Sequence, residues 1–386
     1  MISWDAMIKR TRRPWVAVVL SLLVAGFTLA PSLTASVAAP STPLASPIGR
    51  AAASGLYFDH LVLIVLEGLN ICDVLTYCGG YAPYLTALSD AYGIADQDHF
   101  CNVHPGLPNY LCLTGGTDFG CGGYNEGPHS NACTATAWNA TNIADRLEGA
   151  GLTWKAYMED MQSPCYGSSW YLYEVRRNPF VYYRDIATNA TRCAHVVPSG
   201  DNASVLLGDL ASSSAAPNYV WLSPNSCNGM HTCRISVGDR YLSTLIPRIL
   251  NSTVFQTSRA AVVVTFAEAY GWPIYHVWAG PGVKKGYASS YPYTHLSVLA
   301  TIEANWNLAP LTPNDRDAAH MGEFFQGQPS RGLNEPPPHP IPARYVIVIS
   351  GTGGIGVLVA SVILFRRERR GLRGPETADR PHEPVE

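Results

Sequence analysis

Short apolar runs alternate with segments of helical periodicity through the middle of the chain. The runs span 60–66, 218–222, 261–266 and 276–279, and the helical segments span 83–92, 142–149, 205–212, 239–250 and 294–306. Ala261-Val262-Val263-Val264 is apolar on both faces, which is typical of a strand buried in a mainly parallel sheet covered by helices. The pattern therefore predicts an α/β fold.

Polar residues follow three of these apolar runs at the point where each ends. Glu67 follows the first run, the segment 225–231 follows the second, and Glu268 follows the third. Because ligands bind beyond the carboxyl ends of the strands in such sheets, we expect these residues to meet at one edge of the sheet and to form the functional site.

Near the N-terminus, a sixteen-residue apolar segment follows four basic residues, Lys9, Arg10, Arg12 and Arg13. The segment covers 15–30, and small residues follow at 35–39. This order predicts a secretory signal peptide over 1–39. An uncleaved anchor is the alternative, although about 20 residues are usually needed to span a bilayer. Pro40 would hinder cleavage after Ala39, so the cleavage site stays open.

A second apolar segment, 345–365, contains 21 residues and no charge. That length suits a transmembrane helix, and the basic cluster at 366–370 is typical of the cytoplasmic side. We therefore expect a single C-terminal span with a cytoplasmic tail over 366–386 and an exported body. The cell membrane is then both the location of the protein and its first expected partner.

Two segments rich in proline or small residues bound the body. Residues 40–54 are rich in Ala, Ser and Pro and predict a linker. Residues 328–344 begin with a stretch, 328–342, that contains six prolines, which predicts a stiff stalk above the membrane. No second linker or repeat separates the residues between them, so 55–327 is predicted to be one domain.

Composition narrows the class of protein. Hydrophobic residues make up 47% of the chain and charged residues 14%, which is too apolar for a disordered chain. Between Pro14 and Phe365 there are 16 basic and 23 acidic residues. Nucleic acid is excluded as the expected partner, because phosphate contacts need clustered Lys and Arg.

Cysteine and asparagine patterns agree with export. The ten cysteines are an even number, which predicts disulfides in a secreted chain. Local pairing is expected for Cys227 with Cys233, Cys165 with Cys193 and Cys121 with Cys133, which leaves Cys72 with Cys78 and Cys101 with Cys112. Four Asn-x-Ser/Thr sequons predict surface glycosylation at Asn139, Asn189, Asn202 and Asn251.

Seven segments, in order along the body, resemble the phosphoesterase family of acid phosphatases and phospholipases C. They are LIVLE (63–67), HPGLPNYLCLTG (104–115), LTWKAYMEDM (152–161), NPFVYYRDI (178–186), PNYVWLSPNSCNGMHTCRISVGD (217–239), GPGVK (280–284) and YTHLSVLATIE (293–303). The resemblance runs from about residue 59 to residue 325. It implies an alkaline-phosphatase-like α/β/α sandwich, a divalent-metal site and a covalent phosphoryl-enzyme mechanism on phosphomonoesters or phospholipid headgroups.

The mechanism implied by the resemblance needs a hydroxyl nucleophile at a helix N-terminus, metal-binding carboxylates and imidazoles, and a donor for the phosphoryl oxygens. Asn109 matches the family's phosphate-side Asn, and His104 precedes it as an alternative pocket residue or a residue that orders the turn. The implied metal ligands are Glu67, His231 and His295. Glu268 is a further candidate, because it could replace the acidic ligand that is missing at the preceding position, Ala267.

Several positions depart from the pattern that the resemblance implies. The nucleophile position is Gly106, which has no side chain to phosphorylate. Ala267 stands where the family has an acidic ligand, Gly68 stands where an Asn commonly follows the first acidic ligand, and Gly229 and Thr232 stand where the family has Asp residues on both sides of His231. The loss of these carboxylates weakens the site as a cation site.

Three hypotheses about function follow. The first is a membrane-anchored pseudoenzyme that binds a phosphorylated small molecule, a lipid headgroup or a glycan; in such a pocket 170–173 (WYLY) lines the ligand or only packs in the core. The second is an active, metal-dependent phosphoesterase with a rearranged site that uses Glu67, His231 and His295. The third is a structural envelope protein. The replaced residues favour the first.

Overall fold

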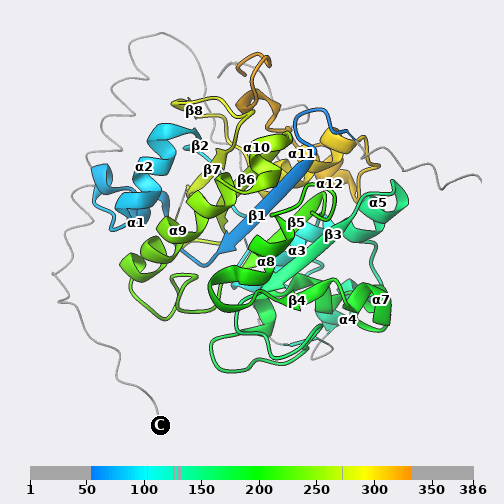
Figure 1. Cartoon of the computed structure of the whole chain (residues 1–386). Helices are drawn as coiled ribbons and strands as arrows, with labels where there is room; N and C mark the ends of the chain where they lie inside the picture. The colour runs from blue at the N-terminus through cyan, green and yellow to red at the C-terminus, as the bar shows by residue number, and fades with distance from the viewer. Residues whose placement is uncertain (1–53, 102, 125–126, 129–131, 272, 332–386) are drawn as a thin grey trace, which may run out of the picture. The chain divides into compact units, whose positions relative to one another are not determined.

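One mainly parallel sheet lies at the centre of the computed structural model, which describes residues 54–331 except 102, 125–126, 129–131 and 272 (Figure 1). The strand order is β4-β3-β5-β1-β6-β7-β2-β8. The strands are β1 (His60–Leu66), β2 (Gly93–Ala95), β3 (Trp154–Met158), β4 (Val196–Pro198), β5 (Tyr219–Ser223), β6 (Ala260–Phe266), β7 (His276–Ala279) and β8 (Tyr287–Ser289).

The central strand β1 is parallel to both of its neighbours. Leu61 pairs with Tyr219 of β5, and the whole of β1 pairs in register with β6 from His60 and Ala260 onward. Strand β7 is antiparallel to both β6 and β2. All seven residues of β1 and of β6 are buried, as expected for strands covered on both faces.

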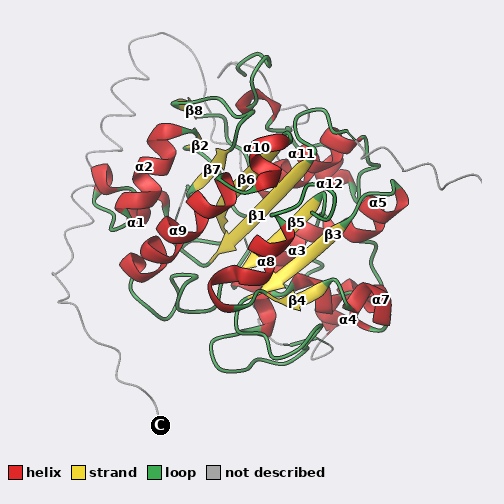
Figure 2. Ribbon diagram, viewed as in Figure 1, coloured by secondary structure: helices red, strands yellow, loops and turns green. Residues whose placement is uncertain are grey.

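Helices cover both faces of the sheet, and α8 and α9 lie in front of it in Figure 2. The helices are α1 (Ile71–Val74), α2 (Pro83–Ala91), α3 (Gly106–Gly115), α4 (Ala132–Trp138), α5 (Ile143–Gly149), α6 (Arg184–Ala187), α7 (Ala190–Cys193), α8 (Ser204–Asp209), α9 (Ile235–Leu250), α10 (Thr253–Thr257), α11 (His295–Trp306) and α12 (Pro313–Arg316). Single 3₁₀ turns are η1 (Thr76–Cys78), η2 (Val175–Arg177), η3 (Pro179–Tyr182), η4 (Asp201–Ala203) and η5 (Gly322–Phe324).

Alternate residues of β1 enter two different cores. Leu61, Leu63 and Val65 pack in a core with residues of α3, α5 and α11, whereas Val62 and Ile64 pack in a core with residues of α2, α8, α9 and α10. Successive side chains of a strand point to opposite faces, so the sheet forms the middle layer of three. The predicted α/β class with a mainly parallel sheet is confirmed.

The predicted start of α9 is wrong. The sequence pattern predicts a helix that begins at Asp239, but α9 begins at Ile235, so Asp239 lies inside the helix. Its buried carboxylate instead accepts hydrogen bonds from the backbone N–H groups of Tyr84 and Leu85, at 3.0 and 2.9 Å. Asp239 therefore caps the first turn of α2 from a different helix.

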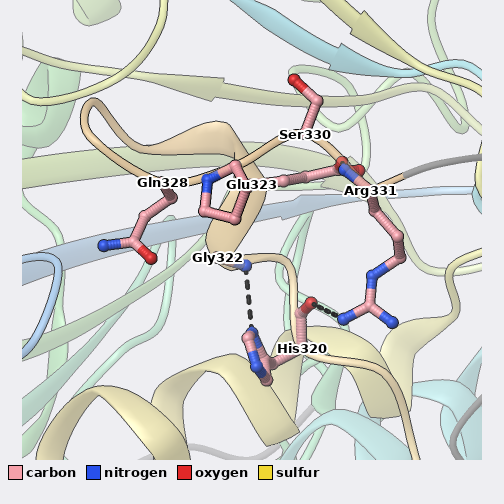
Figure 3. Close-up of a pocket in the computed structure, with 7 residues that line it drawn as sticks. His320, Gly322, Glu323, Gln328, Ser330 and Arg331 are labelled. Carbon is pink, nitrogen blue, oxygen red and sulfur yellow. Dashed lines mark hydrogen bonds between the residues drawn. The ribbon is translucent and has the colours of Figure 1, made fainter.

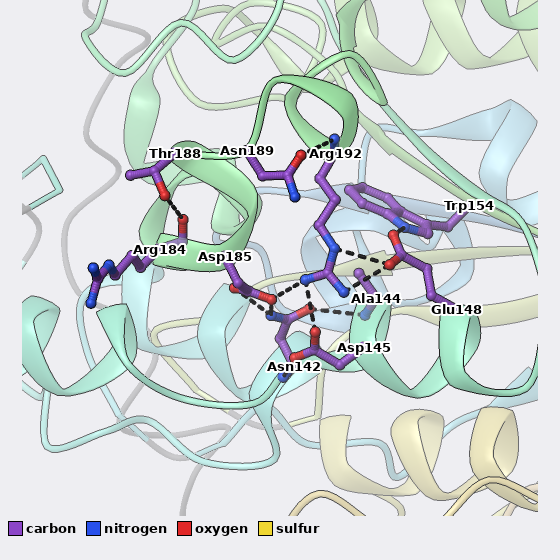
Figure 4. Close-up of polar contacts among 10 residues, drawn as sticks. All are labelled: Asn142, Ala144, Asp145, Glu148, Trp154, Arg184, Asp185, Thr188, Asn189 and Arg192. Carbon is purple, nitrogen blue, oxygen red and sulfur yellow. Dashed lines mark hydrogen bonds and ion pairs between the residues drawn. The ribbon is translucent and has the colours of Figure 1, made fainter.

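A single arginine joins α5, α6 and α7 (Figure 4). Arg192 of α7 forms ion pairs with Asp145 at 2.8 Å, with Glu148 at 2.7 Å and with Asp185. Burial, together with the neighbouring Asp145, raises the pKa of Asp185 to about 6. One guanidinium of α7 thus links carboxylates of α5 and α6.

Four of the predicted disulfides are confirmed, namely Cys72–Cys78, Cys101–Cys112, Cys165–Cys193 and Cys227–Cys233. Cys121 is also disulfide-bonded, and the side chain of its predicted partner, Cys133, lies outside the described residues.

The described residues exclude the predicted signal peptide, most of both linkers, the predicted span over 345–365 and the tail. Within residues 54–331, apart from the short gaps, no helix has the length and apolar character needed to cross a bilayer.

Candidate functional site

A buried carboxylate, Glu67, and a partly buried one, Glu268, meet at the N-terminus of α3, beyond the carboxyl ends of β1 and β6. Glu67 directly follows β1, and Glu268 lies two residues after β6. A Cβ atom added to Gly106 would lie 3.5 Å from Glu67 Oε2 and 3.4 Å from Glu268 Oε1. The structure therefore brings together three of the residues that the sequence singled out.

Gly106 is the first residue of α3 and is buried. Its backbone does not require glycine, because its φ is not positive and both distances from an added Cβ are ordinary contacts. The peptide bond between His104 and Pro105 is cis. As the first residue of α3, Gly106 lies at a helix N-terminus, where backbone N–H groups favour anions. Glycine offers no hydroxyl at this position.

Glu67 forms a buried ion pair with Arg177, which was not predicted from the sequence. Arg177 Nε lies 2.5 Å from Glu67 Oε1, and each side chain is only 3% exposed. The Tyr110 hydroxyl donates to the same carboxylate oxygen at 3.5 Å, and Arg177 Nη2 lies 3.4 Å from Glu174. Sequence reasoning missed Arg177, although it directly precedes the family-like segment that begins at Asn178.

Glu268 is paired with His104. Their Oε2 and Nδ1 atoms are 2.5 Å apart, and the His104 side chain is half exposed. Burial raises the pKa of Glu268, against the opposing effect of His104. The ring of Tyr270, itself almost fully exposed, stacks on His104 with 5.9 Å between ring centroids. The result is a solvent-facing imidazole whose second nitrogen is turned away from the carboxylate.

Asn109 does not face this site. Its amide donates to Val103 O at 2.8 Å and its carbonyl oxygen accepts from Cys101 N at 3.0 Å. These bonds fix the loop that precedes α3, so Asn109 has a structural role in this arrangement.

The two predicted histidine ligands differ in burial and in their partners. His295 opens α11, is fully buried and donates from Nε2 to Ala267 O at 2.8 Å; burial lowers its pKa to about 4. His231 is exposed and contacts Arg176 Nη2 at 3.3 Å. Among the described residues, no three His, Cys, Asp or Glu side chains are arranged to hold a metal ion.

The loop that carries His231 is fixed by Glu159 and a disulfide. Glu159 accepts from Asn225 N at 2.9 Å and from Asn228 Nδ2 at 2.8 Å. Burial raises the pKa of Glu159. The loop also places Gly229 against β1, because Glu67 N donates to Gly229 O at 3.1 Å.

Exposed aromatic side chains lie in the chain segment bonded to this loop. Ser226 N donates to Leu172 O at 2.9 Å, and the preceding Trp170 and Tyr171 are 54% and 81% exposed. Core packing therefore explains neither of these two rings, whereas Tyr173 is buried.

Two other features are separate from this site. A pocket of about 100 Å³ is lined by seven residues after α12 (Figure 3), namely His320, Gly322, Glu323, Gln328, Pro329, Ser330 and Arg331. None of these residues was predicted to be functional. The four sequon residues, Asn139, Asn189, Asn202 and Asn251, are all exposed, as glycosylation requires.

Comparison with known proteins gives a family match and several relatives. The model of the phosphoesterase family matches residues 74–309. An acid phosphatase of Aspergillus fumigatus is 27% identical over 298 residues, which is 73% of this chain and 62% of the relative. A phosphatidylinositol-3-phosphatase of Mycobacterium tuberculosis is 27% identical over 307 residues, which is 78% of this chain and 93% of the relative.

The chain spans less than two thirds of the length of two fungal acid phosphatases that it matches, 62% for that of Aspergillus fumigatus and 63% for that of Penicillium chrysogenum. Among solved structures, a protein of the alkaline phosphatase superfamily from Vibrio parahaemolyticus is similar with a TM-score of 0.46 and 12% identity, over 66% of this chain and 68% of that chain.

Proposed function

Because the chain belongs to the phosphoesterase family, we propose that its body binds a phosphate ester at the N-terminus of α3 without forming a phosphoryl-enzyme. The observation that carries this proposal is Gly106, which lies between Glu67 and Glu268 where a nucleophile would be needed. Loss of a nucleophile alone typically lowers kcat by several orders of magnitude.

The geometry supports binding of an anionic group. The N-terminal N–H groups of a helix of this length attract phosphate oxygens, and Arg176 and His104 provide further donors at the rim, with side chains 23% and 50% exposed. Trp170 and Tyr171 are exposed beside the same loop system and suit the apolar or sugar part of a ligand. The ligand class is a phosphorylated small molecule, a lipid headgroup or a phosphorylated glycan.

The experiment measures binding and turnover separately. We expect calorimetry to detect binding of inorganic phosphate, and Arg176→Gln to weaken it several-fold. Chromogenic phosphomonoesters and phosphodiesters should be turned over far more slowly than the roughly 1 s⁻¹ of ordinary enzymes, with and without added divalent metals. Turnover at ordinary rates with a trapped phosphoryl-enzyme would overturn the proposal, and so would the absence of phosphate binding.

The pair of His104 and Glu268 favours a second candidate, a hydrolase that uses water in place of the missing hydroxyl. His104 would accept a proton from a water whose oxygen forms a bond to phosphorus. The bond between phosphorus and the ester oxygen would break, and the leaving alkoxide would take a proton from the protonated His104 or from solvent. Glu268 would orient the imidazole, as carboxylates do in other acid–base pairs. If this is the reaction, any measured turnover falls in both His104→Gln and Glu268→Gln, and no phosphoryl-enzyme accumulates.

We further propose that the body is exported and anchored by the segment 345–365. The disulfides support an oxidising compartment, and the exposed sequons are compatible with glycosylation. A substrate or ligand in the membrane, such as a lipid headgroup, would then be within reach of the site.

A further inference from the structure

The residues around Glu67 do not fit a divalent metal ion, although the phosphoesterase family implies one. The Arg177 guanidinium lies 2.5 Å from the Glu67 carboxylate in a site where both side chains are 3% exposed. A guanidinium keeps its proton in proteins. A metal ion on Glu67 would therefore lie a few ångströms from a fixed positive charge, with little water to screen the repulsion.

The glycine at position 229 makes room for this guanidinium. A Cβ atom added to Gly229 would lie 3.2 Å from Arg177 Nη1 and 2.8 Å from Asn225 O. An aspartate here, which the resemblance leads us to expect, would need the space that Arg177 fills. The Asn225 carbonyl and Arg177 thus both crowd any side chain at position 229, where the resemblance leads us to expect a carboxylate.

The other candidate ligands already hold polar contacts, although Nδ1 of the buried His295 has no hydrogen-bond partner among the described residues. Glu268 is bound to His104 at 2.5 Å, and the Nε2 atom of His295 donates to Ala267 O. His231 contacts the neighbouring Arg176. A cation bound to Glu268 Oε2, His295 Nε2 or His231 Nε2 would have to displace one of these contacts.

We propose that Arg177 is the resident cation of this site and replaces the metal ion, so that the fold and the proposed phosphate site are independent of divalent metals. The proposal deepens the proposed function, since it names the positive charge that balances Glu67 when a phosphate group binds. It makes Arg177 a positioning residue, which acts through Glu67 and not by contact with a reacting atom.

The first test uses the purified full-length chain in detergent. After dialysis without chelator, we expect elemental analysis to find no stoichiometric zinc, manganese, magnesium, calcium or iron. We expect the Tm to be the same with EDTA and with each metal at millimolar concentration, whereas a cation present at about 100 times its Kd would raise the Tm by several degrees. Stoichiometric metal, together with a Tm that falls in EDTA, would overturn the proposal.

The second test removes the guanidinium of Arg177 and adds a carboxylate at position 229. In Arg177→Met with Gly229→Asp, we expect manganese or zinc to raise the Tm, since a carboxylate is added where the guanidinium is removed. The control, Arg176→Met, removes the adjacent positive charge but leaves Arg177 in place, and its Tm should not respond to metal. A folded double variant whose Tm does not respond to metal would contradict the proposal that Arg177 replaces a metal ion. If the double variant does not fold, the metal content and Tm of the wild-type chain decide the question.

These tests are separate from the test of phosphate binding. Metal binding by a wild-type chain that also binds phosphate would overturn the role of Arg177 and leave the proposed function standing. A wild-type chain that binds neither would support Arg177 as the resident cation and overturn the proposed function.

Discussion

The buried ion pair of Glu67 and Arg177 is the main residue-scale feature of the site. Both side chains are buried, and the three guanidinium nitrogens of Arg177 have no well-aligned hydrogen bond within the described part of the chain. A buried ion pair repays the cost of removing two charges from water only through close approach. The pair therefore adds little to the net free energy of unfolding. Removal of one partner is costly, because the other charge is left buried without a counter-ion.

We predict that replacing either partner alone is strongly destabilising. Arg177→Met and Glu67→Met should each lower the free energy of unfolding by about 3–5 kcal/mol, whereas Glu67→Met with Arg177→Met should cost far less than the two single changes together. Urea unfolding of wild type, Glu67→Met, Arg177→Met and the double Met variant measures this coupling. Additive losses would contradict a direct interaction between the two side chains.

We predict that Gly106→Ser folds but does not restore a phosphoryl-enzyme. An added Cβ fits at ordinary contact distances, so the change in Tm should be small. Turnover of a chromogenic phosphomonoester by Gly106→Ser should stay close to that of the wild type, because Arg177 still occupies the cation position beside Glu67. Full activity in Gly106→Ser alone would show that the remaining residues suffice.

The site was predicted from the sequence only where local pattern determines position. Glu67 and Glu268 were placed correctly because they follow buried parallel strands, and the ends of such strands share one edge. The pattern could not show that the Asn109 side chain bonds to Val103 O. The direction of that side chain depends on the conformation of the loop that precedes α3. Arg177 was missed because its partner, Glu67, comes from a distant part of the chain.

At the scale of elements, α11 contains a buried carboxyl group close to another. Glu303 is 3% exposed, and burial, together with Asp315, raises its pKa to about 9. Leu311 N donates to both carboxylates, at 3.2 Å to Glu303 and 2.7 Å to Asp315. Glu303 is therefore protonated in the folded chain at neutral pH.

We predict that Glu303→Gln becomes increasingly stabilising as pH rises. The folded-state pKa of Glu303 lies above the unfolded value, so the wild-type chain loses stability from about pH 4.5 up to about pH 9, and an uncharged side chain removes that loss. The Tm difference between variant and wild type should grow by several degrees between pH 5 and pH 8, as about 1 kcal/mol shifts the Tm of a domain this size by roughly 2–4 °C.

Glu323→Gln is the matched control for Glu303→Gln. Burial opposes ionisation of Glu323, but hydrogen bonds from Ser289 and other donors outweigh it and lower the pKa of Glu323. The ionised form is thus favoured by folding above the ordinary pKa, and that stabilisation is lost as pH falls. Glu323→Gln should be destabilising at pH 8, and the same sign for both variants would contradict the assignment.

The elements that were predicted differ from those that were missed in length and in local pattern. Strands β1 and β7 coincide with the predicted runs, and β5 and β6 agree within one residue at each end. Strands β2, β4 and β8 have three residues each, too few for a recognisable alternation. In β3, Lys155 interrupts the apolar run, and α3 contains Gly106, Pro108 and Gly115, which lower helix propensity.

At the scale of the whole molecule, the proposed export of the body and the proposed anchor together predict which side of the membrane the site faces. If the basic cluster at 366–370 is cytoplasmic, the carboxyl end of the sheet and its ligand lie outside the cell. Most substrates of the cytoplasm are then excluded, and lipids of the outer leaflet or external phosphate esters remain.

We predict that protease added to intact cells removes the body and leaves a tag fused after Glu386 intact. The tail should become accessible only after the cells are permeabilised, and detection by immunoblot with and without detergent measures this. Loss of the tag from intact cells would contradict the orientation, and a control tag placed in the linker before residue 54 should be cleaved in both conditions if that linker is retained.

The carboxylate that joins α9 to α2 has a consequence for how the molecule opens. Amide protons of the first turn of α2 are held by Asp239, so they can exchange with solvent only when α9 departs or α2 unfolds. Native-state hydrogen exchange should therefore report one shared opening free energy for the Tyr84 and Leu85 amides and the middle of α9, as for a cooperative unit. In Asp239→Ala the amides of Tyr84 and Leu85 should exchange independently and faster, while those on the far face of the sheet keep their protection.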